Sequence, residues 1–194
     1  DNGPEGYAYR RDEVFDHWSA EPFRGLKRDI YEGGHHVPFI IKWPGLTKSG
    51  SVCDKLVSQI DFMATIASSL GYKLPDNAAE DSHDLLPLLR GKKVNPRTIH
   101  VHNTRADAWA IRVGEWNLIE GKSGYHSRVN KNWETKRNYP ADDKDSVELY
   151  HYDQDRSQRV NLAKKSPKKV AELQKELKIA RERGFTAPRL LDNE

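Results

Sequence analysis

Residues 33–45 have the sequence GGHHVPFIIKWPG, in which a short apolar run lies between two glycines and a Pro-Gly turn. A continuous apolar run of this kind, here residues 37–41, predicts a strand that is buried on both faces, as in a parallel sheet. Residues 58–70 then carry apolar side chains at helical spacing, and Gly71 is a natural end for a helix. A strand followed by a helix indicates an α/β layer, so we expect this region to form one edge of a larger sheet.

The pattern changes after residue 97. Trp109–Val113 and residues 116–119 are two β-prone runs, and the two residues between them, Gly114 and Glu115, are typical of a tight hairpin. Further strands are expected near residues 99–101 and at 147–152. Residues 121–146 are polar and are expected to form a long loop.

A helix is predicted from Ser166-Pro167 to about Arg183, because serine is a good N-terminal cap and proline suits the first turn. Its apolar residues form one narrow stripe, which is typical of a helix packed on a core. We therefore expect residues 96–194 to form a small antiparallel sheet with one packed helix. Residues 1–95, with a short helix near residues 85–89, are expected to belong to the α/β layer.

Composition excludes several classes of protein. The 32 basic residues nearly balance the 29 acidic ones, for a net charge of +3, which is typical of a mixed solvated surface. No apolar stretch is long enough to cross a bilayer, and no nucleic-acid recognition motif is present. Cys53 is the only cysteine, which excludes an intrachain disulfide. The chain starts with aspartate rather than methionine, so we expect it to be a piece of a longer protein.

Two strings carry candidate chemistry. Asp1 and Asn2 place a carboxylate and an amide carbonyl side by side, and these hard oxygen donors suit calcium or magnesium; Asp-Asn-Gly is also a common turn. Lys27, in the stretch FRGLKRDIYEGGHHVP, is a compact cation of the type that holds an anionic oxygen. Alone, this lysine is better explained as a solvated one among Arg24 and Arg28. Gly33-Gly34 in the same stretch would let the backbone turn sharply or approach another group closely.

His100 and His102 lie two residues apart in an expected strand and should point to the same side. A metal pair, a polar wall of a pocket and a plain structural role all fit this spacing. No third ligand at suitable spacing accompanies them, which favours the pocket wall or the structural role.

Taken together and in order, the strings are much more specific. Asp-Asn-Gly is followed by Gly-Leu-Lys, Glu-Gly-Gly-x-x-Val-Pro-x-Ile and Trp-Pro-Gly, and later by Gly114-Glu115-Trp116-Asn117-Leu118-Ile119. Over nearly its whole length the chain resembles the formylglycine-dependent sulfatases. The resemblance implies the C-terminal edge of an alkaline-phosphatase-like sheet, followed by the small antiparallel sheet with its helix.

By this resemblance Asp1 and Asn2 are calcium ligands and Lys27 contacts the sulfate group. A divalent cation and a lysine stabilise the negative charge that develops when a sulfate ester is cleaved. The nucleophile of the family is a formylglycine made from the cysteine of a Cys-x-Pro-x-Arg string. Cys53 is followed by Asp-Lys-Leu, so the formylglycine is expected upstream. We expect a sulfatase fragment that is inactive alone and that needs the N-terminal half of the same protein as its partner.

The expected substrate is a sulfated small molecule or a sulfated carbohydrate, with no nucleic acid and no membrane involved. Three residues are candidates for the substrate-binding rim: His83, His102 and Arg105. They lie on expected loops or strand ends, next to the strings that resemble the family. His36 stands where the family usually has arginine, so a structural ion pair there would depend on protonation. The family resemblance also implies a periplasmic, secreted or lysosomal protein.

Two alternatives stay open at this point. A phosphohydrolase of the same superfamily would also use a bound metal ion to stabilise charge on its substrate, although the Gly-Leu-Lys and Glu-Gly-Gly strings favour a sulfate ester. A non-catalytic module that binds sulfated glycans or a partner would use the basic loop around residues 131–137, in which Trp133 stands among cations.

Overall fold

The computed structural model describes residues 2–104, 108–121, 131–139 and 146–191. The chain forms two compact units, which are described separately. The first comprises residues 1–38 and 101–177, and the second comprises residues 39–100 and 178–194. A compact unit is not the same division as a domain of a longer enzyme, so the expected domain boundary after residue 95 stays a prediction.

A four-stranded antiparallel sheet forms the centre of the first unit. Its strands lie in sequence order, β1 (Ile99–Asn103), β2 (Trp109–Val113), β3 (Trp116–Glu120) and β4 (Val147–His151). Val113 pairs with Trp116 across a two-residue turn, in which Gly114 has a φ of +56°. The predicted hairpin and the predicted C-terminal sheet are therefore confirmed.

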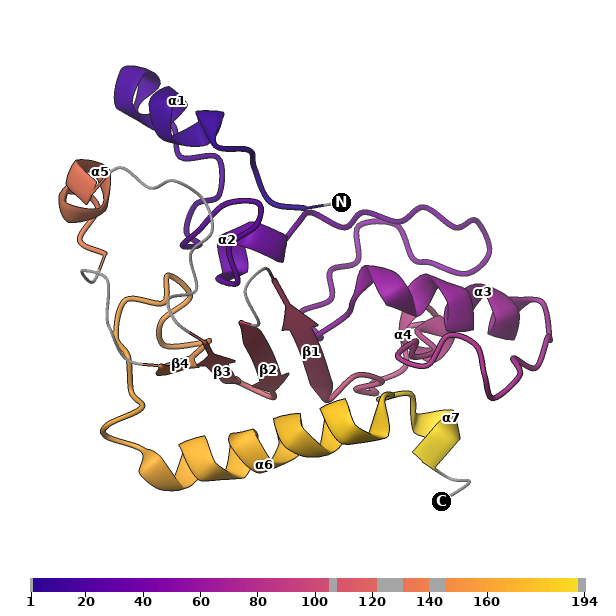
Figure 1. Cartoon of the computed structure of the whole chain (residues 1–194). Coiled ribbons are helices and arrows are strands. Elements are labelled where there is room, and N and C mark those ends of the chain that lie inside the picture. Colours follow the sequence, from indigo (N-terminus) through magenta and orange to yellow (C-terminus); the bar gives the residue numbers. More distant parts are fainter. Residues whose placement is uncertain (1, 105–107, 122–130, 140–145, 192–194) are drawn as a thin grey trace. The chain divides into compact units, whose positions relative to one another are not determined.

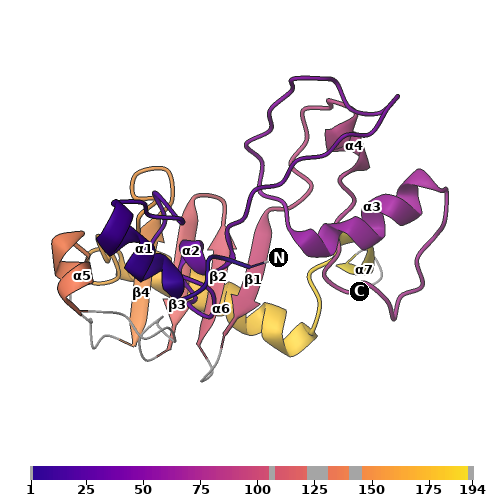
Figure 2. The same cartoon turned by 90° about the horizontal axis from the view of Figure 1, so that it is seen from above.

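The two faces of the sheet bury different partners. Ile111, Leu118 and Leu149 are paired neighbours on one face and are all fully buried. Figures 1 and 2 show α6 (Pro167–Arg183) running along this side of the sheet. Leu173 and Leu177 of α6 are each 1% exposed, so the predicted apolar stripe is buried as expected.

The opposite face of the sheet holds the N-terminal loops. Ala110, Ile119 and Tyr150 form one buried cluster with Ile30 and Tyr31. The hydroxyl of Tyr31 also donates to Glu148 on β4 at 2.9 Å. These contacts seat the loop that leads into α2 (Glu32–His35) on the sheet, and this loop carries the Glu-Gly-Gly string.

Four helices were not predicted from the sequence, and two of them, α2 and α7 (Pro188–Leu191), have only four residues each. The other two are α1 (Tyr7–Phe15) and, within the expected long loop, α5 (Lys131–Lys136). Tyr9, Trp18 and Trp133 pack ring against ring, with centroids 4.5–5.5 Å apart. Because this aromatic cluster joins segments far apart in the sequence, local periodicity carried no signal for either helix.

The second unit contains the 3₁₀ turn η1 (Gln59–Asp61), α3 (Phe62–Ser69), α4 (Leu86–Leu89) and α7 (Pro188–Leu191). The predicted helices near residues 58–70 and 85–89 are confirmed. A buried ion pair holds this unit together: the guanidinium of Arg97, 1% exposed, binds both oxygens of Asp61. Asp61 also accepts a hydrogen bond from the backbone N–H of Ser58, which caps η1.

The strand predicted over residues 37–41 is wrong for the described chain. These residues form neither helix nor strand, and Ile40 is 93% exposed. A strand exists only where a neighbouring strand accepts its backbone hydrogen bonds, and the described residues supply no such neighbour here. Within those residues, no helix is both long and apolar enough to cross a membrane.

Candidate functional site

The segment that carries Asn2 is pressed against the Glu-Gly-Gly turn. The backbone N–H of Gly3 donates to Gly34 O at 2.9 Å. A Cβ on Gly3 would lie 1.8 Å from Gly33 O, so no other residue fits there. This close approach holds the backbone next to Asn2, which is exposed. Asp1, the other predicted metal ligand, lies outside the described residues.

Lys27 lies on a tight turn beside the same segment. Asp29 closes the turn, because its carboxylate accepts from Leu26 N at 2.8 Å and its own N–H donates to Leu26 O at 2.8 Å. The backbone N–H of Lys27 donates to Pro4 O at 2.9 Å. The fold therefore brings two of the predicted site residues, Asn2 and Lys27, onto adjoining backbone segments.

Two further glycines make this packing possible. A Cβ on Gly33 would lie 2.2 Å from Gly25 O, and one on Gly34 would lie 2.1 Å from Asp29 O. The Lys27 turn and α2 therefore touch backbone to backbone. A sharp turn or a close approach of the backbone was expected at Gly33-Gly34, and the structure shows a close approach.

The sequence analysis did not single out the charged neighbours of Lys27. Lys27 Nζ lies 2.9 Å from Glu5 Oε1, and Arg28 lies 3.3 Å from Glu5 Oε2. The hydrogen bond from Lys27 holds the pKa of Glu5 below its usual range. Glu5 stands two residues after the Asp-Asn-Gly string, so a search for charges next to that motif would have found it.

Glu32 is a buried carboxylate behind the site. It receives hydrogen bonds from His36 Nδ1 at 3.0 Å and from Asn117 Nδ2 at 3.4 Å. Burial tends to raise its pKa, but the hydrogen bond from His36 and the positive charge near it outweigh burial, and the pKa falls to about 2. Glu32 is therefore a permanent anion at neutral pH, and it holds α2 to the sheet.

His36 and His102 each pack against a neighbouring ring. The His36 ring stacks on Phe23, with centroids 4.1 Å apart. His102 packs against the ring of His35, also at 4.1 Å, and its Nε2 donates to Ile30 O at 3.1 Å. Burial lowers the pKa of His35, which favours its neutral form. His102 therefore supports the wall beneath the Glu-Gly-Gly turn.

The other two predicted substrate contacts do not belong to the described part of the first unit. Arg105 lies outside the described residues. His83 belongs to the second unit, where it is 4% exposed and its Nδ1 donates to Pro96 O at 2.7 Å. Its backbone N–H also donates to Asp61 at 2.9 Å, so His83 is part of the buried network around Arg97.

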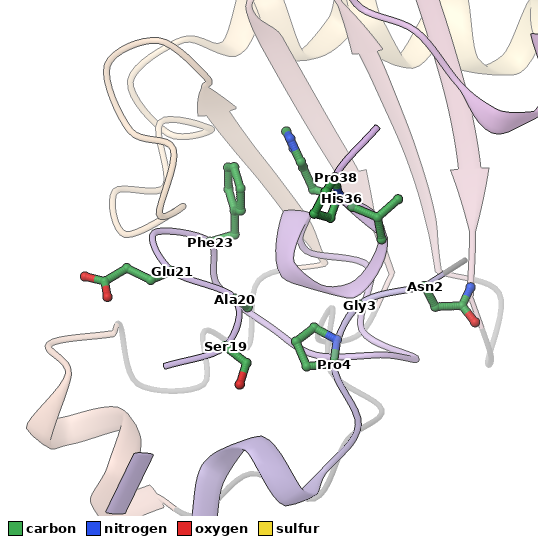
Figure 3. Close-up of a pocket in the computed structure, with 10 residues that line it drawn as sticks. Asn2, Gly3, Pro4, Ser19, Ala20, Glu21, Phe23, His36 and Pro38 are labelled. Carbon is green, nitrogen blue, oxygen red and sulfur yellow. The ribbon is translucent and has the colours of Figure 1, made fainter. Parts of the chain in front are cut away.

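A cavity of about 400 Å³ lies beside Asn2, which is within the usual range for small-molecule sites. Its lining comes from three segments, near residues 2–4, 19–23 and 36–38. Figure 3 shows Asn2 and Glu21 at opposite ends of this lining, with Phe23 and His36 on the side nearer the sheet. An aromatic ring, a carboxylate, a hydroxyl and an amide together suit a polar, ring-shaped ligand.

The predicted glycan-binding loop has a structural role where it is described. Trp133 is 3% exposed, and its indole N–H donates to Asp12 at 2.6 Å. Arg137 forms an ion pair with the same carboxylate, which raises the pKa of the arginine. These two side chains hold α5 against α1.

The possible metal ligands of the described chain are scattered. Across the described ranges, no three histidine, cysteine, aspartate or glutamate side chains gather closely enough to hold a metal ion. The His100 and His102 pair therefore lacks a third ligand of these types there. Asn2 offers a hard amide oxygen on an exposed segment, which fits one position of a calcium site.

The chain is similar in sequence to a known protein family and to characterised enzymes. Residues 25–183 match the family described as N-sulphoglucosamine sulphohydrolase, C-terminal. The chain is 34% identical to an N-acetylgalactosamine-6-O-sulfatase of Bacteroides thetaiotaomicron, covering 94% of this chain and 35% of that protein. It is also 28% identical to an arylsulfatase of Hemicentrotus pulcherrimus, covering 64% of this chain and 22% of the relative.

Solved structures show the same fold. One, from work on glycosaminoglycan metabolism by Bacteroides thetaiotaomicron, superposes with a TM-score of 0.66 at 31% identity, covering 82% of this chain and 32% of that one. Another, solved with its substrate D-glucosamine-2-N,6-O-disulfate, gives a TM-score of 0.51 at 18% identity, covering 74% of this chain and 27% of that one, and supports the fold alone. The chain thus spans about a third of the length of the first relative.

Proposed function

This chain belongs to the sulfatase family as a C-terminal part, and from that premise we propose that it serves in the hydrolysis of sulfate esters within a longer enzyme. The observation that carries this proposal is the packing of the Asn2 segment and the Lys27 turn on Gly33-Gly34. A lysine beside a hard oxygen donor suits the charge distribution of a sulfuryl group. The fold class expected from the sequence agrees with the solved sulfatase structures.

Lys27 is assigned the role of holding a sulfate oxygen and stabilising the negative charge that develops during cleavage. Its turn, closed by Asp29, fixes the backbone from which the lysine side chain extends. Asn2, together with Asp1, would supply two ligands to a calcium ion. Calcium, when bound, would add positive charge next to the sulfate group.

The nucleophile is proposed to lie outside this chain. Cys53 is exposed and lacks the Cys-x-Pro-x-Arg context of a formylglycine precursor. We therefore propose that the 194-residue chain is inactive alone, and that the formylglycine and the remaining calcium ligands come from the N-terminal part of the same protein.

A sulfated carbohydrate is the proposed substrate. The relative with 34% identity is an N-acetylgalactosamine-6-O-sulfatase, and the cavity beside Asn2 has an aromatic ring and polar groups that suit a sugar. His102 would act indirectly, because it holds Ile30 at the start of the Glu-Gly-Gly turn. Arg105 stays a proposed contact with a second part of the substrate, whereas His83 is assigned a structural role in the buried network around Arg97.

The proposal is tested in the complete protein by the substitution Lys27→Ala, with Lys42→Ala as the matched control because Lys42 is an exposed lysine of the same chain. The expected result with an aryl sulfate is a loss of kcat of about 100-fold or more for Lys27→Ala and no change for the control. Full activity of Lys27→Ala would overturn the role of Lys27. Faster turnover of the matching aryl phosphate would favour the phosphohydrolase reading.

The non-catalytic alternative is not favoured by the geometry. It required a glycan-binding face around residues 131–137, whereas Trp133 is buried and Arg137 is paired with Asp12. Retention on a heparin column that is lost when Lys131 and Lys136 are neutralised would revive this reading.

A further inference from the structure

Two cations from adjacent residues meet at one carboxylate in the first unit. Lys27 lies 2.9 Å from Oε1 of Glu5, and Arg28 lies 3.3 Å from Oε2. The three side chains are 38%, 47% and 48% exposed, in the order Lys27, Arg28, Glu5. A dissolved anion therefore has access to both cations.

Arg28 holds this position in a strained backbone conformation. Its φ is +84°, in the region that glycine occupies readily and arginine rarely. The surrounding bonds enforce it, because Thr104 Oγ1 donates to Arg28 O at 2.6 Å and Asp29 closes the turn on Leu26. Strain that the surroundings maintain is characteristic of functional positions, and here it places a guanidinium beside Lys27.

We propose that Lys27 and Arg28 together form an oxyanion site, in which the Glu5 carboxylate holds the place of a sulfate group. This inference rests on the proposed function, which assigned only Lys27 to the sulfate. Each oxygen of Glu5 faces one cation. Two oxygens of a sulfate group would bind the same two cations in the same way. The planar guanidinium suits such oxygens, and the ammonium acts as a point charge.

Glu5 is displaceable because the ion pair is exposed. Water screens exposed pairs, so they contribute little net stability. A sulfate group that enters the site replaces the carboxylate on both cations, and Glu5 then turns to solvent. Glu5 keeps the two cations together before substrate arrives, and it also competes with the sulfate.

The test measures binding of inorganic sulfate to the complete protein by isothermal titration calorimetry, at constant ionic strength with chloride as the balancing anion. Arg28→Asn removes the cation with a residue that tolerates this backbone conformation, and Arg10→Asn, on the exposed face of α1, is the matched control. We expect Arg28→Asn to weaken sulfate binding about tenfold, Arg10→Asn to leave it unchanged, and Glu5→Gln to tighten it several-fold.

Wild-type sulfate affinity in Arg28→Asn would overturn the inference, as would weaker binding by Glu5→Gln. A second substitution, Arg28→Gly, removes the side chain and also the strain of the positive φ, so the variant should fold with unchanged or higher stability. It should show the same loss of sulfate affinity as Arg28→Asn, which excludes misfolding as the cause. Failure of the proposed function gives a different result. In that case the complete protein would not cleave aryl sulfates, although sulfate would still bind the chain through Arg28.

Discussion

At the scale of single residues, the candidate site depends on three glycines that allow backbone segments to touch. Gly3, Gly33 and Gly34 each leave less than 2.3 Å between an added Cβ and a backbone oxygen. Backbone oxygens cannot move aside as a flexible side chain does, so even a methyl group must displace a whole segment.

Gly33→Ala should therefore destabilise the chain strongly. Its methyl group would lie 2.2 Å from Gly25 O and 2.6 Å from Arg24 O, and we expect a loss of roughly 3 kcal/mol in the free energy of unfolding. Urea denaturation measures this loss. Gly6→Ala is the control, because an added Cβ there meets nothing within 4 Å; equal stability of the two variants would contradict the packing described here.

Glu32 makes stability depend on pH in a defined window. Its pKa of about 2 in the folded chain lies below the value of about 4.3 for an unfolded glutamate. The carboxylate therefore stabilises the fold above the unfolded pKa by roughly 3 kcal/mol, and this contribution is lost as the pH falls from about 5 to 2.

Glu32→Gln should accordingly be much less stable than the wild type at pH 7, and the difference should shrink as the pH falls through this window. Chemical denaturation at pH 7, 5 and 3 measures the difference. Glu182→Gln, at an exposed position of α6, should show almost no effect. A difference that stays constant from pH 7 to pH 3 would argue against the ionised, buried carboxylate.

At the scale of elements, α1 and α5 depend on one shared carboxylate. Asp12 of α1 accepts from the indole N–H of Trp133 at 2.6 Å and forms an ion pair with Arg137. Neither helix has a long apolar stripe of its own, and α5 has only six residues. Short helices are marginal in isolation, so their mutual contact stabilises both.

Asp12→Asn should loosen α5 without abolishing the fold. The change removes the charge that Arg137 binds at a buried position, which we expect to cost roughly 3 kcal/mol. Asp16→Asn is the control, because Asp16 approaches the same arginine at 3.4 Å but its side chain is 89% exposed. Urea denaturation gives the loss, and limited proteolysis near residues 131–137 reports on α5. Equal proteolysis of the two variants would contradict the role of Asp12.

At the scale of the whole molecule, the second unit presents an apolar surface on α3. Ile60, Met63, Ile66 and Leu70 are 47–77% exposed. Only the opposite side of α3, with Ala64 and Ala67, is buried. The chain spans about a third of its first relative, and we expect the rest of a sulfatase to cover this surface.

The isolated chain should therefore self-associate through α3. Exposed apolar patches on soluble proteins favour association, so sedimentation should show a mass that increases with concentration. The double substitution Met63→Lys and Ile66→Lys should shift the chain toward the monomer. Val14→Lys, at an exposed apolar position of α1, should not. Unchanged association in the double variant would place the contact elsewhere.

The sequence by itself determined the elements whose signals are local. The hairpin at Gly114-Glu115, the strand at β4 and the helix α6 follow from turn chemistry, alternation and helical spacing, which act within a few residues. The motif strings likewise led to the family, and the glycines of the Glu-Gly-Gly string pointed to a sharp turn or close approach of the backbone.

Only the tertiary structure decided what depends on distant partners. The run at residues 37–41 has the composition of a strand but no neighbouring strand among the described residues, and α1 exists because Trp133, more than a hundred residues away, packs against it. The pairing of Lys27 and Arg28 on Glu5 likewise joins segments more than twenty residues apart. The physical reason is the same in each case: backbone hydrogen bonds, buried rings and ion pairs need partners that the fold, and not the neighbouring sequence, supplies.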